Sequence, residues 1–252
     1  MIAEGFQKPA IKRFDLTLPG SDTMSFKPIR GGLTIIGTPV YGGRVPKTFV
    51  ERIRRIAAQN APAVVVAVYG NRHFDDALVE LNDLATKAGF NVIAGGAFIG
   101  EHSFTDNSTP IAKGRPDKSD VFTATDFGIR IKGKFESLCD VSDSVLKLPG
   151  NVPYKDDMPD LEAAPITAEE LCTQCGVCLE VCPTGAINSG DMTITDPKLC
   201  IQCCACVKVC QFEARTMEHP GILKKKEWIL QNCQKRKEPA MYFKDQSTVI
   251  RF

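Results

Sequence analysis

Ten of the eleven cysteines lie in the C-terminal part of the chain, and their spacing is the feature of this sequence with the clearest chemical meaning. Two runs, CTQCGVCLEVCP at 172–183 and CIQCCACVKVCQ at 200–211, each place four cysteines in the pattern C-x2-C-x2-C-x3-C. Thiolates are soft ligands that suit iron–sulfur clusters and zinc. A structural zinc site closes on four ligands, usually from paired C-x2-C motifs. A doubled run of four cysteines therefore favours two iron–sulfur clusters over zinc.

Charge and composition narrow the class of protein further. The 31 basic and 30 acidic residues give a net charge of +1, which argues against bulk electrostatic binding of nucleic acid. No stretch approaches 18 consecutive apolar residues, so we expect no transmembrane segment. The opening residues MIAEGFQKPAIKRF lack the basic start and apolar core of a secretory signal. We therefore expect a cytoplasmic protein whose cysteines serve metal or redox chemistry rather than disulfides.

The cysteine-rich region resembles the bacterial-type ferredoxins that hold two [4Fe–4S] clusters, including the Gly185-Ala186-Ile187 that follows the first run. In those proteins the fourth cysteine of each run ligates the other cluster. The resemblance therefore implies two ligand sets: Cys172, Cys175, Cys178 and Cys210; and Cys200, Cys203, Cys206 and Cys182. Cys204 has no place in this pattern, and we expect it to be a small packed side chain, as we do for Cys139 and Cys233.

The N-terminal part alternates apolar runs with amphipathic stretches. The apolar runs predict strands at 33–36, 63–69 and 91–98, with a weaker strand at 11–16. Apolar spacings of three and four predict helices at 46–59, 75–87 and 117–135. Buried strands separated by helices indicate an α/β fold, a doubly wound parallel sheet covered on both faces.

Composition changes divide the chain into four parts. Residues 149–165 hold four prolines and four acidic residues, which is typical of an extended linker. We therefore expect a sheet domain at 1–148, a linker at 149–165, a small α+β ferredoxin-like domain at 166–216 and a helical tail at 217–252. Basic residues at 224–226 and 235–237 give that tail a basic face, either solvated or a docking patch for an acidic partner.

Two glycine-bearing loops follow predicted strands and resemble the flavin-binding loops of flavodoxins. Tyr41 matches the aromatic residue that covers one face of the FMN ring, and Phe74, or alternatively Tyr69, would cover the other face. The resemblance implies FMN-binding residues in both loops: Thr38, Pro39, Tyr41, Gly42, Gly43, Tyr69, Gly70, Asn71 and Phe74. A third loop at 100–104 carries His102 and Ser103 toward the same edge of the sheet.

Nearly the whole chain thus resembles the flavodoxin–ferredoxin fusion proteins of anaerobes, most clearly in the cysteines and in VAVYGNR and GAFIGEHSF. The resemblance implies a flavodoxin-like sheet with strand order 2-1-3-4-5 and electron transfer between FMN and the clusters. No phosphate-binding turn of the flavodoxin type occurs, and residues 1–6 resemble the end of the first helix. We therefore expect Met1 to be an internal methionine of a longer protein, or else that tight flavin binding has been lost.

The favoured function is an electron relay between two [4Fe–4S] clusters and FMN, serving redox partner proteins. One alternative is a flavin-dependent oxidoreductase that acts on a small substrate with His102 or Ser103 as the proton source. The other is a ferredoxin whose N-terminal domain is a flavin-free docking module. The sequence shows no Ser–His–Asp arrangement, phosphate-binding P-loop or paired carboxylates that would indicate a hydrolase or kinase.

Overall fold

The computed structural model describes residues 1–6, 10–137, 146–156, 161–244 and 250–251. Its larger part is a five-stranded sheet in the order β1-β2-β3-β6-β7. The first three strands are parallel, β6 pairs with β3 in antiparallel fashion, and β7 pairs with β6 in the same way. The strands are β1 Thr34–Pro39, β2 Ala61–Tyr69, β3 Phe90–Ile99, β6 Ala240–Phe243 and β7 Ile250–Arg251. The predicted α/β class with a parallel sheet is therefore confirmed.

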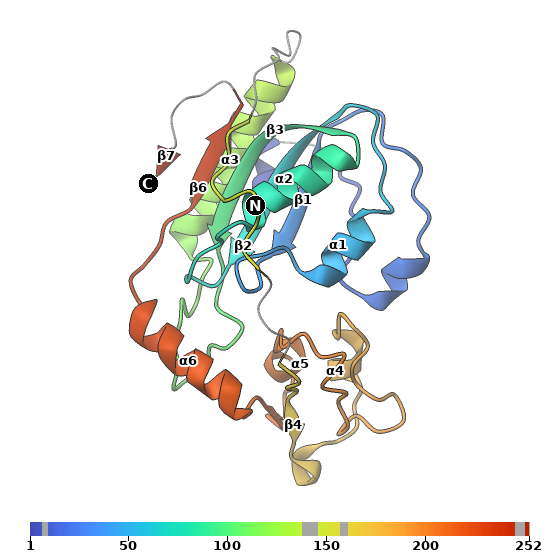
Figure 1. Cartoon of the computed structure of the whole chain (residues 1–252), viewed down its shortest axis with the longest axis vertical. Helices are drawn as coiled ribbons and strands as arrows, with labels where there is room; N and C mark the ends of the chain where they lie inside the picture. The colour runs from blue at the N-terminus through green and yellow to red at the C-terminus, as the bar shows by residue number, and fades with distance from the viewer. Residues whose placement is uncertain (7–9, 138–145, 157–160, 245–249, 252) are drawn as a thin grey trace.

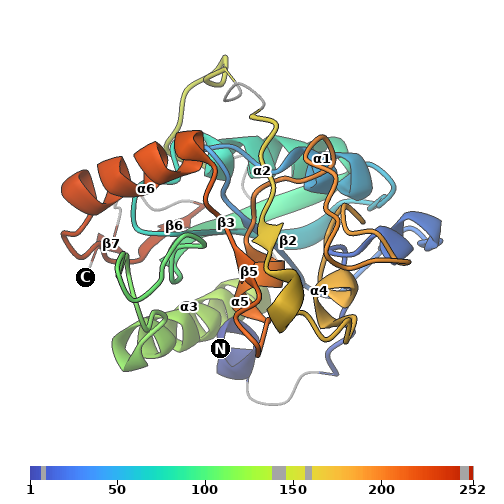
Figure 2. The ribbon, with the colours of Figure 1, turned by 90° about the horizontal axis from the view of Figure 1, so that it is seen from below.

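Helices cover both faces of the sheet (Figures 1 and 2). On one face lie α1 Lys47–Ile53 and α2 Ala77–Lys87, and on the other lie α3 Lys118–Glu136 and the short 3-10 helix η1 Ile2–Phe6. Successive residues of a strand point to opposite faces. Hence the β2 residues Val64 and Val66 join the α3 layer, and Val65 joins the α2 layer. Burial on both faces explains why β2 is an almost continuous apolar run.

The predicted helices are present, but the first is shorter than expected. Helix α1 ends at Ile53 rather than near residue 59, because the chain must turn there to enter β2. In that turn Ala58 and Asn60 donate to the carbonyls of Ala88 and Gly89 at the end of α2. Helix α3 begins with a reciprocal capping box between Asp117 and Asp120, which fixes its first turn.

The weak strand predicted at 11–16 is not a strand. These residues are extended and largely exposed without a strand partner, and the carbonyls of Leu16 and Thr17 accept hydrogen bonds from Arg52 instead. The guanidinium of Arg52 gives these two backbone carbonyls hydrogen-bond partners, so they do not require a neighbouring strand. Strand β1 therefore forms one edge of the described sheet, and the flavodoxin order 2-1-3-4-5 is not found among the described strands.

The C-terminal segment is helical only in its first part. Helix α6 Pro220–Asn232 is followed by β6, whose four residues are all buried and pair with β3 in the register Ala94↔Phe243 to Ala97↔Ala240. The expectation of a helical tail is wrong for these residues. An apolar AMYF segment gains burial and hydrogen bonds by completing the edge of β3, which a solvated helix would not provide.

The predicted linker has neither helix nor strand in its described part, and there it is fastened to the sheet domain. The buried carboxylate of Asp76, beside the start of α2, accepts hydrogen bonds from the backbone of Asn151 and Lys155 at 2.8 and 2.7 Å. Tyr154 donates to Asp83, and Arg44 donates to the carbonyl of Lys155 at 2.5 Å. These contacts fix where the chain enters the cysteine-rich region.

The cysteine-rich region lies beyond the ends of β1, β2 and β3 at which their following loops begin (Figure 1). Its elements are very short: β4 Ile166–Thr167, η3 Glu169–Leu171, α4 Val177–Glu180, α5 Ala205–Lys208 and β5 Arg215–Thr216. A further 3-10 turn, η2 Pro19–Thr23, lies in the N-terminal segment. The loops at the carboxyl edge of the sheet are thus the part of the sheet domain that faces the cysteines.

Candidate metal centre

The two cysteine runs fold into two equivalent halves. Gln174 and Gln202 occupy matching positions with φ of 55° and 59°, and Gly176 and Cys204 match with φ of 82° and 56°. Gly176 and Cys204 each precede a one-turn helix, α4 or α5. Left-handed residues turn the chain tightly. Such turns let three cysteines at steps of three face a common centre.

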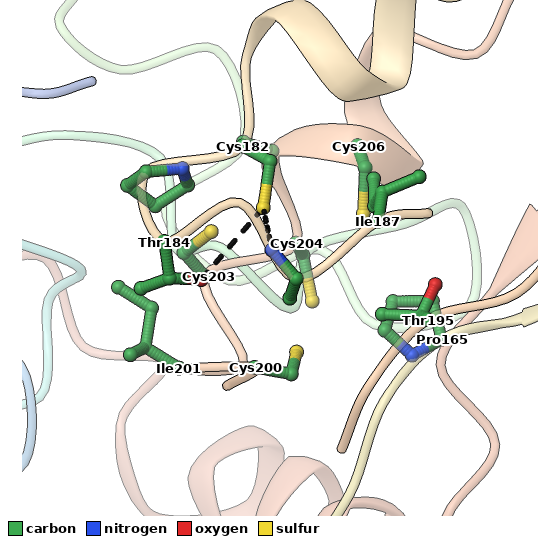
Figure 3. Close-up of a pocket in the computed structure, with 13 residues that line it drawn as sticks. Pro165, Cys182, Thr184, Ile187, Thr195, Cys200, Ile201, Cys203, Cys204 and Cys206 are labelled. Carbon is green, nitrogen blue, oxygen red and sulfur yellow. Dashed lines mark hydrogen bonds between the residues drawn. The ribbon is translucent and has the colours of Figure 1, made fainter. Parts of the chain in front are cut away.

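One predicted ligand set surrounds a single pocket (Figure 3). We call it the inner set, and it consists of Cys182, Cys200, Cys203 and Cys206. Cys182 comes from the first run and the other three come from the second, so the chain crosses between halves as the ferredoxin resemblance implies. Apolar side chains complete the wall, among them Pro165, Ile187 and Ile201.

The inner thiols form a donor set that suits a metal cluster. Burial raises the pKa of Cys203 to about 11, and burial is also the main cause that raises the pKa of Cys200 and of Cys206. Four sulfur atoms gathered in an apolar pocket cannot carry negative charge together unless a cation compensates it. Iron supplies that compensation and binds thiolates, so this donor set fits a [4Fe–4S] cluster.

Cys182 is the inner thiol whose pKa is lowered, and hydrogen bonds from backbone amides are the reason. Its burial alone would raise the pKa, but hydrogen bonds from the amides of Thr184, Ala186 and Gly185 outweigh burial and lower it. The Ala186 amide lies 3.3 Å from the Cys182 sulfur. Amides directed at a cluster sulfur are a recognised means of tuning its potential. The Gly185-Ala186-Ile187 segment supplies this contact, with Gly185 at a left-handed φ of 65°.

The other four cysteines form what we call the outer set: Cys172, Cys175, Cys178 and Cys210. Cys175 is exposed and the other three are half-buried. In the part of the chain that the structure describes, no three His, Cys, Asp or Glu side chains converge as ligands of one metal ion. A [4Fe–4S] cluster is a larger body that presents a separate iron to each thiolate. The assignment of all eight ligands stays a prediction.

Cys204 and Cys233 are packed side chains. Cys204 is buried against Ala163, Met217 and Ile222, and burial raises its pKa to about 12. Its sulfur lies 3.7 Å from the carbonyl of Gln202, to which the thiol donates. Cys233 is buried in a second small apolar cluster around α6. Cys139 falls outside the described residues.

The three loops at the carboxyl edge of the sheet meet, but they pack directly on one another. The amide of Asp76 donates to the carbonyl of Gly43 at 3.0 Å, and a Cβ on Gly43 would overlap the Asp75 carboxylate. A Cβ on Gly70 would likewise overlap His102. The glycines predicted to lie against a flavin are therefore used for close contact between the loops.

The aromatic residues predicted to hold FMN are also packed. Tyr69 and Phe74 are 6% and 7% exposed, belong to the core on the α2 face, and meet edge to face with ring centroids 5.4 Å apart. His73 stacks on Phe74 at 4.9 Å. As placed, these rings leave no open pair of faces for a flavin, so the residues do not fit FMN. FMN stays a prediction.

The remaining predicted flavin residues link the sheet to the rest of the chain. The buried Asn71 amide donates to the carbonyls of Cys233 and Lys235 at 2.6 and 3.0 Å, which fastens the segment after α6. Thr38 is buried at the end of β1, where its hydroxyl donates to Pro39 at 3.2 Å. Burial, beside Cys203 and Cys204, raises the pKa of the Tyr41 hydroxyl. Tyr41 is thus the predicted flavin residue that borders the inner set.

His102 is half-buried, and its imidazole is neutral at pH 7. Burial, with the nearby charges of Arg72 and Lys208, lowers its pKa to about 4. Its Nδ1 accepts a hydrogen bond from the Phe104 amide at 3.0 Å. This arrangement holds the imidazole as part of the loop packing, and it stores no proton at neutral pH.

Two buried arginines near the cysteines, Arg52 and Arg215, were not predicted from the sequence. Arg52 of α1 donates to the carbonyl of Pro183 at 2.9 Å and to Asp22 at 2.9 Å, so it ties the residue after Cys182 to the sheet domain. Arg215 lies between the cysteine runs and touches Cys178. No sequence pattern indicates the role of Arg52, because its partners are brought to it only by the fold. Arg215 could have been found by aligning the two runs, since it matches the apolar Ile187.

Comparison with known families supports the chemistry of the cysteine-rich region. A model of the 4Fe-4S binding domain matches residues 165–188 and 193–216, one match for each run. No curated protein matches the chain. The chain therefore carries a 4Fe-4S ferredoxin domain, which supports a role in iron–sulfur electron transfer. None of the helices in the described part of the chain combines the length and apolar character that crossing a bilayer requires.

Proposed function

We propose that this protein carries single electrons through two [4Fe–4S] clusters in series, one on each cysteine set. It exchanges them with redox partner proteins in a reducing, cytoplasmic compartment. The observation that carries the proposal is the crossed inner set, in which cysteines from both runs surround one pocket (Figure 3). Each cluster supplies one-electron chemistry when bound, and the chain binds it, shields it and sets its surroundings.

The two sets have different access to partners. Cys175 of the outer set is exposed, whereas Cys206 of the inner set is buried and the half-buried Cys203 lies near Tyr41 of the sheet domain. Electron transfer slows steeply with distance, so partners exchange electrons most readily at the exposed side. We infer that the outer set faces the partner protein and the inner set lies deeper in the path.

The sheet domain serves as a rigid platform for the cysteine-rich region. Arg52 binds the carbonyl of Pro183, Lys208 of α5 binds Glu101 at 3.0 Å, and Phe104 packs beside Cys204. These contacts come from two separate elements of the sheet domain, α1 and the loop after β3. They favour a ferredoxin with a flavin-free supporting domain, since Tyr69 and Phe74 already pack against each other edge to face in the core.

A flavin relay is the second candidate. Its support is the meeting of three glycine-bearing loops beside Tyr41, next to the inner set. This candidate requires Tyr69 and Phe74 to separate from each other when FMN enters. A flavin-dependent oxidoreductase acting on a small substrate depends on the same rearrangement.

Anaerobic purification followed by metal, sulfide and flavin quantitation tests these proposals. Two clusters predict about eight irons and about eight labile sulfides per chain, with paramagnetic signals after reduction by dithionite. Stoichiometric zinc without sulfide would overturn the electron-transfer proposal. One FMN per chain would replace the flavin-free platform by the relay. Cys175→Ser should disturb the cluster signals, and the matched Cys233→Ser should leave them unchanged.

A further inference from the structure

Arg215 is a buried cation placed against the cysteines of both runs. Its side chain is 3% exposed, although it is the first residue of a two-residue strand, β5. One terminal nitrogen, Nη1, lies 3.9 Å from the sulfur of Cys178 in the outer set and donates to the carbonyl of Met192 at 2.6 Å. The other, Nη2, donates to the hydroxyl of Thr195. The guanidinium charge also acts on the thiol of Cys206 in the inner set, where it opposes the rise in pKa that burial causes.

The positive charge of Arg215 has no carboxylate partner within the described residues, and its Nε is buried without a hydrogen-bond partner. An unpaired buried charge is strongly unfavourable unless an anion lies nearby. Besides one carbonyl and one hydroxyl, the polar group that the guanidinium contacts is the sulfur of Cys178. Negative charge on a thiolate-ligated cluster beside Arg215 would therefore stabilise this buried cation.

The internal repeat shows that this arginine is an asymmetric feature. Arg215 pairs with Thr167 in the β4–β5 ladder, and the equivalent residue of the first run, Ile187, pairs with Thr195. Ile187 is buried and lines the pocket of the inner set. The matching residue Arg215 contacts Cys178 of the outer set. The inner set therefore has an aliphatic side chain at the position where the outer set has a cation.

We propose that Arg215 raises the reduction potential of the cluster on the outer set above that of the cluster on the inner set. This inference rests on the proposed function, because it requires both clusters to be bound. Reduction adds one electron to a centre and breaks no bond, so the site gains one negative charge. A fixed cation in a dry environment stabilises that added charge. Arg215 contacts a ligand sulfur of the outer set directly, whereas the matching residue at the inner set, Ile187, carries no charge.

The test is a potentiometric titration of the full chain, followed by electron paramagnetic resonance with dithionite as the reductant. Arg215→Gln removes the charge and keeps a polar group that reaches toward Met192 and Thr195. At the wild-type midpoint of the outer cluster, we expect its reduced-to-oxidised ratio to fall at least about tenfold, a shift of ~59 mV for one electron. Arg215→Lys should stay close to the wild type. The matched control Lys224→Gln removes an exposed charge on α6 and should shift neither potential.

A shift in Arg215→Gln no larger than that in Lys224→Gln, with both clusters loaded, would overturn the proposal. Should Arg215→Gln fail to load its clusters, the wild-type titration decides. Its higher-potential signal should be the one that Cys175→Ser removes and Cys203→Ser spares, and the reverse assignment would overturn the proposal. A protein without iron or sulfide would instead contradict the proposed function.

Discussion

The sheet domain and the cysteine-rich region are stabilised in opposite ways. The sheet domain buries apolar layers on both faces of its strands, with long helices and fully buried side chains such as Phe127 and Met241. The cysteine-rich region has helices of four residues and strands of two, and its own apolar clusters are small. A small segment with so little core depends on bound metal for its fold. The chemistry of this protein thus lies where structure depends most on a cofactor.

Removal of the clusters should produce the largest separation between the two regions. Chelation or air oxidation should unfold residues 166–216, because the thiolates then lose the irons that hold the two runs together. The sheet domain should remain folded, since its core does not involve metal. Hydrogen exchange should show loss of protection throughout the cysteine-rich region and changes below about tenfold in β2 and β3. Simultaneous opening of both regions would contradict the comparison.

Loss of one ligand should reveal whether the halves are crossed. Cys182→Ser should remove or destabilise the cluster that also uses Cys200, Cys203 and Cys206, with a loss of up to about four irons per chain. The matched variant Cys204→Ser changes a buried cysteine in the same pocket and should keep about eight irons. Iron analysis and paramagnetic resonance measure both. Selective loss of the cluster on Cys172, Cys175 and Cys178 would show that the ligands are not crossed.

A core substitution in β6 should affect the sheet domain and spare the clusters. Met241 is fully buried between β3 and α3, so Met241→Ala should lower the free energy of unfolding of the sheet domain by ~2–5 kcal/mol. The half-exposed Ile129→Ala on α3 is the control, with an expected change of about 0.5 kcal/mol or less. Urea unfolding followed by circular dichroism measures both. Unchanged stability in Met241→Ala would show that β6 does not contribute to this core.

The smallest expected effect is a pH dependence from His102, at the boundary between the regions. Burial lowers its folded-state pKa to about 4 from a usual value of 6.5, so the unfolded chain binds the proton more tightly. The stabilisation is complete above pH 6.5 and is lost as the pH falls toward 4, to a limit of about 3 kcal/mol.

Urea titrations at pH 7 and pH 5 measure this effect. His102→Gln should show a smaller loss of stability between the two pH values than the wild type. His73→Gln changes a histidine whose side chain is half exposed, and should behave as the wild type does. Equal losses in the wild type and in His102→Gln would show that His102 does not titrate differently in the two states.

Much of the fold follows from local pattern. The apolar runs located β1, β2 and β3 to within a few residues, and helical spacing located α2 and α3 almost as well. The misplaced strand at 11–16 and the tail beyond α6 failed for one reason. Their partners, Arg52 and the open edge of β3, are distant in sequence. Short apolar segments take the structure that their neighbours in space impose.

The sequence by itself determined the chemistry of the cysteine-rich region, because ligand spacing is a property of a short stretch of chain. The doubled C-x2-C-x2-C-x3-C run is a ferredoxin ligand pattern that can be read without knowledge of the surrounding fold. Only the tertiary structure decided what surrounds that site. It packed Tyr69 against Phe74, placed Arg52 on the residue after Cys182, and buried Arg215 beside Cys178. Such contacts depend on how elements distant in sequence pack together. Because hydrophobic burial is non-directional, the local sequence does not show which residues will become partners.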